Sequence, residues 1–370
     1  MSQPLKVGLI GAGSFARAHQ PAYQNFPEVL KMTAVCDIRE DAAGQYARDV
    51  GAEAVYTDAE TMLKEGDIDA VDICTIHDQH YGNVLAAAEA GKHILIEKPM
   101  GIDIQECREM LAATEKAGTT FMVAQCLRFQ PHNRVVHQMI QEGEFGDIWA
   151  VRSDNFYATA PPRSEAKKQP APTTGSWWMD GKRSGGGALI AQSTHHLDLF
   201  RYYIGDVKRV TAKSWTDHPV WTHGAEESIA ATLEFENGAI GHIFSSWTTR
   251  APWNHCYWMM GEYGSAVSRY MPDSIGPEQY MGPVDVSLPK YDSTDEKDRW
   301  KGPGFVHLDT SAADLPTDQP VVNEILHFAD CIREGKEPIS SGKDNLGTMK
   351  LVLGIYEAAN TGKPLDLADF

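Results

Sequence analysis

The sequence predicts an α/β fold followed by an α+β region: a doubly wound parallel sheet of the Rossmann type, then a carboxy-terminal domain built on a large, mostly antiparallel open sheet. Three observations lead there. Short apolar runs alternate with helical patterns up to residue 124, longer runs of alternating polarity follow, and 370 residues exceed what one hydrophobic core usually serves. We therefore expect two domains, residues 1–124 and 125–370.

The first domain is predicted from five continuous apolar runs, LKVGLI, MTAVCD, AVDICTI, HILIEKP and TTFMVAQ. Amphipathic stretches lie between them, among them DAAGQYARDV, YGNVLAAAEAG and IQECREMLAATEKAG. Apolar strands separated by helices are typical of βαβ units, in which helices cover both faces of a parallel sheet. This domain is therefore expected to bind a ligand at the carboxyl ends of its strands.

The second domain is predicted from a helix over 131–141 and four alternating runs, IWAVRSDNFYA, VKRVTAKSW, SIAATLEFE and AIGHIFSSW. Asn237-Gly238 between the last two runs predicts a hairpin, and GEYG at 261–264 predicts another turn. Further helices are expected over 186–204, 320–334 and 343–360, and the last of them could pack back on the first domain. Residues 158–175 and 282–304 are expected to be long loops, because proline, glycine and charge interrupt any pattern there.

Composition narrows the possible partners. The formal net charge of −18 argues against nucleic acid, whose binding depends on a basic surface. The apolar runs are far shorter than the roughly 20 residues of a membrane helix, and the amino terminus has no apolar signal core, so the cytoplasm is the expected location. The six scattered cysteines contain no C-x-x-C pair and are expected to be reduced and mostly buried.

A glycine pattern follows the first strand. In VGLIGAGSFARAH, Gly11, Gly13 and Ala16 form G-x-G-x-x-A at the opening of a helix. The first glycine permits a tight turn, the second lets the backbone approach a pyrophosphate, and the alanine permits close packing of helix on strand. Asp37 ends the next strand, where a carboxylate binds ribose hydroxyls and favours NAD, although Arg39 could receive the 2′-phosphate of NADP.

Two polar stretches follow neighbouring strands of the same sheet. TIHDQH, Thr75–His80, and Glu97-Lys98-Pro99 should both border the nicotinamide end of the site. Partial burial could lower the pKa of Lys98 and let it hydrogen-bond a substrate hydroxyl. The alternative is a surface lysine paired with Glu97. Oxidation of a secondary alcohol also needs a base, which is commonly histidine and could come from the other domain.

The glycine pattern, Asp37, EKP and the later GGGALIAQSTHHLDL together resemble the glucose–fructose oxidoreductase / inositol dehydrogenase / MocA (Gfo/Idh/MocA) family. The resemblance extends over nearly the whole chain and includes RFQP at 128–131, SWWMDGKRSGGG and a terminal GKPLDL. It implies that Lys98 and His195 face the substrate beside the nicotinamide, with His195 as the base. His80 matches the last histidine of the family's TPNxxH. The family also implies a homodimer or homotetramer formed through the second sheet.

One position departs from the family pattern. Its frequent aspartate, one helical turn before the histidine, is Ala191 here. The missing role could be filled by Gln192, Asp198, His196 or a loop residue. The departure argues against carrying over the specificity of inositol dehydrogenase.

The histidine pair has other interpretations. Adjacent helical residues point about 100° apart, so His195 and His196 do not readily share a metal, and no metal ligand is predicted. His196 is interpreted as a packing residue, and Asp198 could pair with Arg201. Trp177 and Trp178 could line a sugar pocket or pack in the core. Arg128 and Arg183 could bind a polar substrate or form ion pairs.

The predicted site consists of three groups. The catalytic residues are Lys98 and His195. The cofactor-binding residues are Gly11, Gly13, Ser14, Phe15, Asp37, Ile38, Arg39, Thr75, His77, His80, Glu97, Lys98 and Gln125. The substrate-binding residues are Lys98, Arg128, Trp178, Gln192 and His195.

These features predict an NAD(P)-dependent oxidoreductase that acts on a CH–OH group of a sugar, glycoside or cyclic polyol. Two alternatives remain open at this point. One is a glycosidase or lyase that oxidises the sugar transiently and returns the hydride. The other is a cofactor-binding regulator without catalysis, against which the presence of Lys98 and His195 argues.

Overall fold

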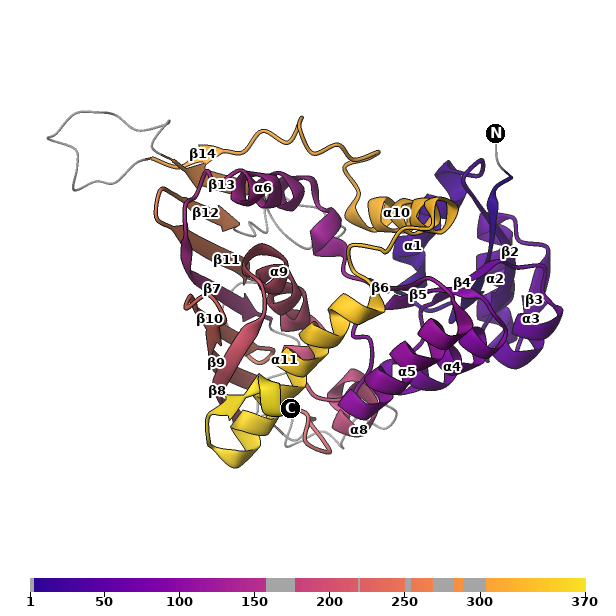
Figure 1. Cartoon of the computed structure of the whole chain (residues 1–370). Coiled ribbons are helices and arrows are strands. Elements are labelled where there is room, and N and C mark those ends of the chain that lie inside the picture. Colours follow the sequence, from indigo (N-terminus) through magenta and orange to yellow (C-terminus); the bar gives the residue numbers. More distant parts are fainter. Residues whose placement is uncertain (1–2, 158–176, 219, 250–253, 269–282, 289–303) are drawn as a thin grey trace, which may run out of the picture. The chain divides into compact units, whose positions relative to one another are not determined.

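The computed structural model describes residues 3–157, 177–218, 220–249, 254–268, 283–288 and 304–370 (Figure 1). They divide into two units. The first contains Met1–Phe129 and Pro316–Met349, and the second contains Gln130–Leu315 and Lys350–Phe370. The division differs from the expected boundary at 124/125 because a second segment, Pro316–Met349, returns to the first unit.

The first unit is built on a six-stranded parallel sheet. Its strands are β1 (Leu5–Ile10), β2 (Leu30–Cys36), β3 (Ala54–Tyr56), β4 (Ala70–Ile73), β5 (His93–Glu97) and β6 (Phe121–Ala124). They lie in the order β3-β2-β1-β4-β5-β6, which confirms the doubly wound fold. The short strand β3 was not among the expected apolar runs, since none of its three residues is buried.

The first unit contains six complete α-helices among the described residues. They are α1 (Ala16–Asn25), α2 (Glu40–Val50), α3 (Ala59–Glu65), α4 (His80–Glu89), α5 (Ile104–Ala117) and α10 (Pro320–Glu334). Asp103 caps α5 by accepting from two backbone N–H groups, and Gly118 ends that helix in the left-handed conformation. The 3-10 turns His77–Gln79 and Cys126–Phe129 follow strands β4 and β6.

Helix α10 explains why Pro316–Met349 belongs to the first unit. Its side chains Val322, Ile325 and Phe328 are buried in the same hydrophobic core as Leu9 of β1. The helix also packs against α1. Helix α11 (Gly342–Thr361) begins in the first unit, and its residues from Lys350 onward belong to the second.

The second unit is built on a nine-stranded sheet in the order β14-β13-β12-β11-β7-β10-β9-β8-β15. The strands are β7 (Ile148–Phe156), β8 (Val207–Trp215), β9 (Ser228–Phe235), β10 (Ile240–Ser246), β11 (Asn254–Gly261), β12 (Ser265–Ser268), β13 (Val284–Ser287), β14 (Val306–His307) and β15 (Leu365–Asp366). Neighbouring strands are antiparallel except for β7 and β10, which run parallel. The expectation of a mostly antiparallel sheet is thus confirmed.

Turns connect these strands much as the sequence predicts. Strands β9 and β10 form the hairpin at Asn237-Gly238. Gly238 has a φ of 88°, and Phe235 N–H donates to the Ala239 carbonyl, so the loop contains three residues with glycine in the left-handed position. The turn at 261–264 joins β11 to β12, with Gly261 N–H donating to the Gly264 carbonyl.

The prediction of a loop over residues 282–304 is partly wrong. Within 282–304, residues Val284–Ser287 form β13, because Val284 and Val286 are buried and the strand pairs with β12 and β14. Residues 289–303 of that loop, and the expected loop at 158–175, lie outside the described residues.

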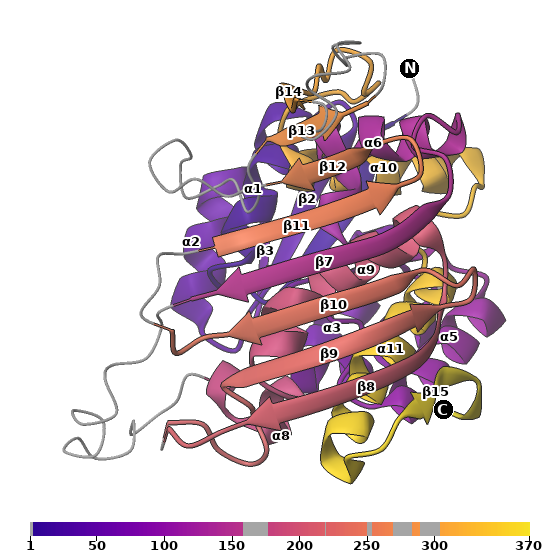
Figure 2. The same ribbon diagram turned by 90° about the vertical axis from the view of Figure 1, so that its left-hand side faces the viewer.

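Besides the later part of α11, the described helical elements of the second unit are α6 (Pro131–Gln141), the 3-10 turn Trp177–Met179, α8 (Gly181–Ser184), a π-helical turn Leu189–Ser193, α9 (Thr194–Ile204) and the 3-10 turn Leu367–Asp369. Helix α9 packs on β7, behind the sheet in the view of Figure 2. No described helix covers the face turned to the viewer there. The strand register places Trp215 and Ile240 on one face of the sheet, and both are exposed.

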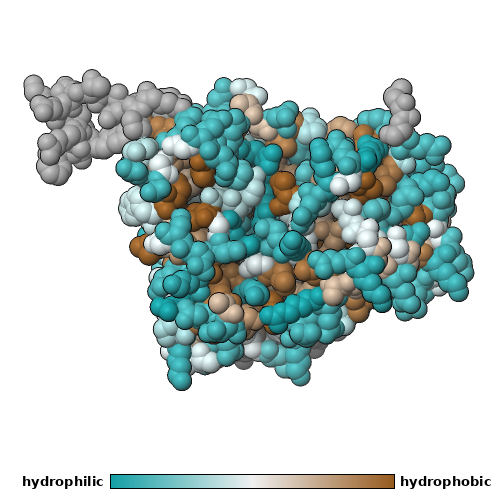
Figure 3. All heavy atoms as spheres, viewed as in Figure 1, coloured by the Kyte–Doolittle hydropathy of each residue, from teal (hydrophilic) through white to brown (hydrophobic). Residues whose placement is uncertain are grey.

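The surface is mainly polar, and the cysteines lie in the interior. Most residues on the face seen in Figure 3 are hydrophilic, with scattered apolar side chains between them. Among the described residues, no helix combines the length and the apolar character needed to cross a bilayer. All six cysteines are buried as free thiols.

Candidate functional site

The glycine-rich turn between β1 and α1 has the geometry that its sequence predicts. Gly11 has a φ of 96°, and its N–H donates to the Cys36 carbonyl at 2.8 Å. A Cβ on Gly11 would lie 2.8 Å from the carbonyl atoms of Cys74, so a larger residue does not fit. A Cβ on Gly13 would meet nothing within 4 Å. The turn therefore presents open backbone at the amino end of α1, where N–H groups can bind an anion.

Asp37 directly follows β2 and is hydrogen-bonded to that turn. Its Oδ2 accepts from Ala12 N–H at 2.9 Å, while Oδ1 accepts from Arg39 N–H at 2.9 Å and from Arg39 Nε at 3.3 Å. The Arg39 side chain is largely exposed, and Ile38 is 90% exposed. The carboxylate and the guanidinium thus lie side by side. This geometry is compatible with the 2′-hydroxyl of NAD, which the carboxylate would bind, and with the 2′-phosphate of NADP, which the guanidinium would bind.

Several predicted residues gather at the carboxyl ends of β4, β5 and β6. Thr75 Oγ1 and both amide atoms of Gln125 are buried, and none of them has a hydrogen-bond partner among the described residues. Buried polar atoms are rarely left without partners, so these three fit a polar ligand. His80 lies between the carbonyls of Pro99 and Thr75, at 2.8 and 3.2 Å, and burial lowers its pKa. His77 is buried beside it, with ring centroids 5.8 Å apart.

Lys98 lies directly after β5 and is buried, with 8% of its surface exposed. Burial lowers the pKa of Lys98, and the charges of Glu97 and Cys126 act in the opposite direction. Its Nζ lies 5.7 Å from the ring centre of Phe15, which is half exposed on the glycine-rich turn next to exposed Ser14. The Lys98-Pro99 peptide bond is cis. This burial is not that of a surface lysine.

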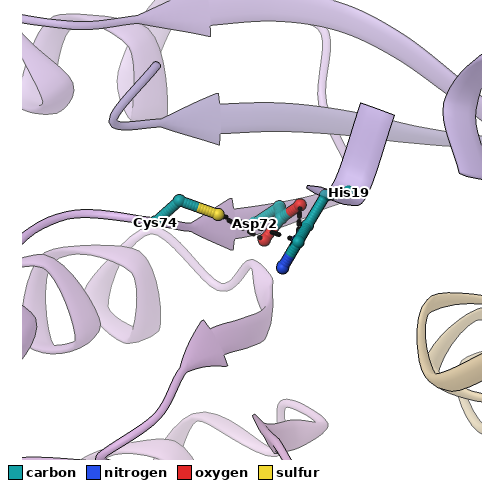
Figure 4. Close-up of side chains that lie close together, drawn as sticks. All are labelled: His19, Asp72 and Cys74. Atoms are coloured by element: carbon teal, nitrogen blue, oxygen red, sulfur yellow. Dashed lines mark hydrogen bonds and ion pairs between the residues drawn. The ribbon is translucent and has the colours of Figure 1, made fainter. Parts of the chain in front are cut away.

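A buried polar network that includes His19, Asp72 and Cys74 was missed by sequence reasoning (Figure 4). His19 of α1 lies between two carboxylates, with Nδ1 2.9 Å from Asp72 Oδ2 and Nε2 3.1 Å from Glu97 Oε1. Although burial alone would lower it, Asp72 and Cys74 raise the pKa of His19 well above its usual value. Glu97 in turn accepts the Lys98 backbone N–H at 3.0 Å.

The same cluster has the residue types of a metal site. Suitable atoms of His19, Asp72 and Cys74 lie within 4.8 Å of one another. Asp72, however, already accepts from Tyr23 Oη at 2.7 Å and from His19, while burial raises the pKa of the Cys74 thiol and keeps it protonated. We therefore interpret the cluster as hydrogen-bonded. The spacing of buried Ala16, His19 and Tyr23 on one helical face was the signal that could have found it.

The three glycines before the histidines are each explained by a different constraint. Gly185 ends α8 in the left-handed conformation with a φ of 81°. A Cβ on Gly186 would lie 2.1 Å from Tyr356 Oη, and one on Gly187 would lie 1.9 Å from the Glu226 carbonyl oxygen. The helix expected from residue 186 accordingly begins later, with the π-helical turn at Leu189.

His195 and His196 follow that turn in different surroundings. His195 is buried with 6% exposure as the second residue of α9. His196 is fully buried, its Nδ1 bonds the Ser153 hydroxyl, and its ring stacks on His255 at 4.2 Å. Burial and the neighbouring histidines lower the pKa of His196 well below its usual value. The neutral, stacked ring fits a packing role. Asp198 is also fully buried, and Arg201 pairs with Asp206.

Ala191 lies where the missing carboxylate would have been, and its surroundings are aromatic. It belongs to a hydrophobic cluster with Tyr157, Trp221 and Trp247. Trp178 packs at the edge of this cluster, 4.9 Å from the Trp247 ring. Next to Ala191, the Oε1 atom of Gln192 is buried and has no hydrogen-bond partner among the described residues.

Arg128 and Arg183 lie in contrasting positions. Arg128 is 2% exposed, donates to the Ile339 carbonyl and forms an ion pair with Asp344 at 2.6 Å, all within the first unit. These contacts favour the ion-pair alternative over substrate binding. Arg183 is exposed on α8.

Comparison with known proteins agrees with this geometry. Residues 5–125 match the Gfo/Idh/MocA oxidoreductase family, described as an NAD-binding Rossmann fold, and residues 133–267 match the family's carboxy-terminal domain. An uncharacterized oxidoreductase of Bacillus subtilis is 27% identical over 370 residues, 99% of this chain and 98% of the relative. D-Apiose dehydrogenase of Paraburkholderia graminis is 26% identical over 371 residues, 98% of this chain and 89% of the relative.

A solved structure is also similar over the full length. Levoglucosan dehydrogenase in complex with NADH and L-sorbose aligns with a TM-score of 0.85 at 25% identity, covering 99% of both chains. The curated levoglucosan dehydrogenase of Pseudarthrobacter phenanthrenivorans is 28% identical over 298 residues, 72% of this chain and 74% of the relative.

Proposed function

This chain belongs to the Gfo/Idh/MocA oxidoreductase family, and we propose that it is a dehydrogenase that moves a hydride between NAD and a secondary alcohol or ketone of a sugar, glycoside or cyclic polyol. The substrate class is supported by relatives that are named as dehydrogenases of D-apiose, levoglucosan, D-glucosides and myo-inositol. The observation that carries the proposal is the buried Lys98, with its lowered pKa, beside the open glycine-rich turn.

The residues present fit a nicotinamide dinucleotide. The backbone at Gly13 is open to a pyrophosphate. The buried side-chain atoms of Thr75 and Gln125 have no hydrogen-bond partner among the described residues, and an amide group of the cofactor could supply one. When bound, NAD supplies the hydride-accepting ring. Asp37 supports NAD over NADP, because a carboxylate at this place binds ribose hydroxyls and repels a 2′-phosphate.

Two side chains would act on the substrate. Lys98 donates a hydrogen bond to the reacting oxygen, which its burial makes stronger than the same bond in water. His195 accepts the hydroxyl proton as the carbon loses its hydride, and it returns a proton when the ketone is reduced. Gln192 offers an acceptor for a further hydroxyl. The exposed Trp215 and Ile240, which share one face of the sheet, support the expected homo-oligomer.

The test is a screen of monosaccharides, glycosides and inositols with NAD and with NADP, following the absorbance of the reduced nicotinamide. Lys98→Ala and His195→Asn should each lower kcat about 100-fold or more and leave the Kd for NAD within about twofold of wild type. Lys64→Ala, which changes an exposed lysine on α3, is the control. Near-normal turnover of either variant would sink the assignment, as would glycoside cleavage without net NADH.

A further inference from the structure

A buried glutamate holds the start of the helix that carries His195. Glu226 precedes β9 and is 3% exposed. Its Oε2 accepts from Gly187 N–H at 2.6 Å, and its Oε1 accepts from Leu189 N–H at 2.7 Å. One carboxylate therefore satisfies two backbone donors that the first turn of a helix leaves free.

Tyr356 completes this cap from α11. Its hydroxyl donates to Glu226 Oε1 at 3.2 Å and accepts from the N–H groups of Gly187 and Ile190, at 3.2 and 3.1 Å. The Tyr356 hydroxyl approaches this closely because residue 186 is glycine, and the backbone of Glu226 does so because residue 187 is glycine, as the positions of the two absent Cβ atoms show. The cap and the glycines are thus parts of one arrangement.

An ionised glutamate is a costly choice for this place. Burial raises the pKa of Glu226 to about 7, although the N–H groups of Leu189 and Gly187 and the Tyr356 hydroxyl all favour the charged form. The described residues offer it no cationic partner. Serine, threonine or asparagine can cap a helix without the desolvation cost of a charge. What the carboxyl group adds is a second oxygen, so that one side chain bonds the N–H groups of Gly187 and Leu189 together.

The turn that Glu226 holds is π-helical, and it ends two residues before His195. Thr194 N–H donates to the Leu189 carbonyl across this turn. A π-helical turn contains one residue more than the α-helical turn it replaces, and one residue corresponds to about 100° of rotation. If the turn relaxed to α-helix, Gln192 and His195 would point in a different direction relative to Leu189.

We propose that Glu226, together with Tyr356, is a positioning residue for His195: it fixes the π-helical turn and so the direction of the imidazole. The inference rests on the proposed function, in which His195 transfers the substrate proton. Glu226 itself takes no part in the chemistry.

The test compares Glu226→Gln with Glu227→Gln. Glutamine keeps the shape but loses one acceptor, and Glu227 is the adjacent glutamate, also fully buried, whose Oε1 accepts from Asp217 N–H. With the best sugar from the screen, Glu226→Gln should lower kcat about tenfold or more, while the Kd for NAD and the KM for the sugar stay within about threefold. Tyr356→Phe should lower kcat less, and adding it to Glu226→Gln should have little further effect.

A second measurement does not depend on turnover. In protein with isotope-labelled histidine, the ring signal of His195, assigned by its loss in His195→Asn, should shift in Glu226→Gln and stay in place in Glu227→Gln. Unchanged kcat and an unmoved His195 signal in Glu226→Gln would overturn the inference, and so would equal losses in both variants. A wild-type protein inert toward every sugar would count against the proposed function, and the His195 signal would still decide the role of Glu226.

Discussion

Replacing Glu226 with glutamine should remove a specific part of the protein's pH-dependent stability. The pKa of this carboxyl is raised from 4.5 to about 7 by burial. A group whose pKa is higher in the folded than in the unfolded chain stabilises the fold when protonated. That stabilisation is complete below about pH 4.5 and is lost as the pH rises through about 7.

The size of the effect follows from the shift. At about 1.36 kcal/mol per pKa unit, the shift corresponds to roughly 3 kcal/mol in all, of which about 2.5 kcal/mol falls between about pH 5 and pH 8. Glutamine does not titrate. The free energy of unfolding of wild type minus that of Glu226→Gln should therefore fall by about 2.5 kcal/mol over this range.

Urea unfolding at 25 °C and constant ionic strength, repeated at intervals from about pH 5 to about pH 8, measures this difference. All other titrating groups are common to both proteins, so their contributions cancel. A difference that stays constant within about 0.5 kcal/mol across the range would refute the reasoning, because Glu226 would then have an ordinary pKa in the folded chain.

Two further predictions concern the first unit. Asp37→Ala should raise the Kd for NAD about tenfold or more, since hydrogen bonds to a charged group are lost, but should not weaken NADP binding; isothermal titration with Asp41→Ala as an exposed control tests this, and equal losses for both cofactors would contradict it. His19→Ala should destabilise the fold by about 3–5 kcal/mol, because Asp72 and Glu97 would lose the cation between them. Urea unfolding beside the exposed control His242→Ala measures this loss, and a cost under about 1 kcal/mol would exclude a charged His19.

The sequence predicts the parts of the site that depend on local geometry. Gly11 could be assigned because a tight turn before a helix needs a residue that tolerates a φ of 96°. Lys98 could be placed because parallel strands end at one edge of a sheet. The hairpin at Asn237-Gly238 and the burial of the cysteines follow from equally local preferences. Strand β13 was missed because its four residues lie within a stretch dominated by proline and charge.

Contacts between residues far apart in the chain were beyond sequence reasoning. His19 meets Asp72 and Glu97 across 53 and 78 residues, and Tyr356 reaches Gly187 across 169. Nothing in the local sequence of Glu226 marks it as the cap of a helix that begins 37 residues earlier.

The sequence by itself thus determined the two sheets, the glycine-rich turn and the positions of Lys98 and His195 in the chain, because periodicity and turn chemistry act over a few residues. Only the tertiary structure decided which pKa values are shifted and which contacts hold these groups. The pKa values of His19, Lys98 and Glu226 depend on burial and on the carboxylates, thiols and N–H groups that folding brings to them. Desolvation and charge–charge interaction are properties of three-dimensional proximity, which a one-dimensional pattern does not contain.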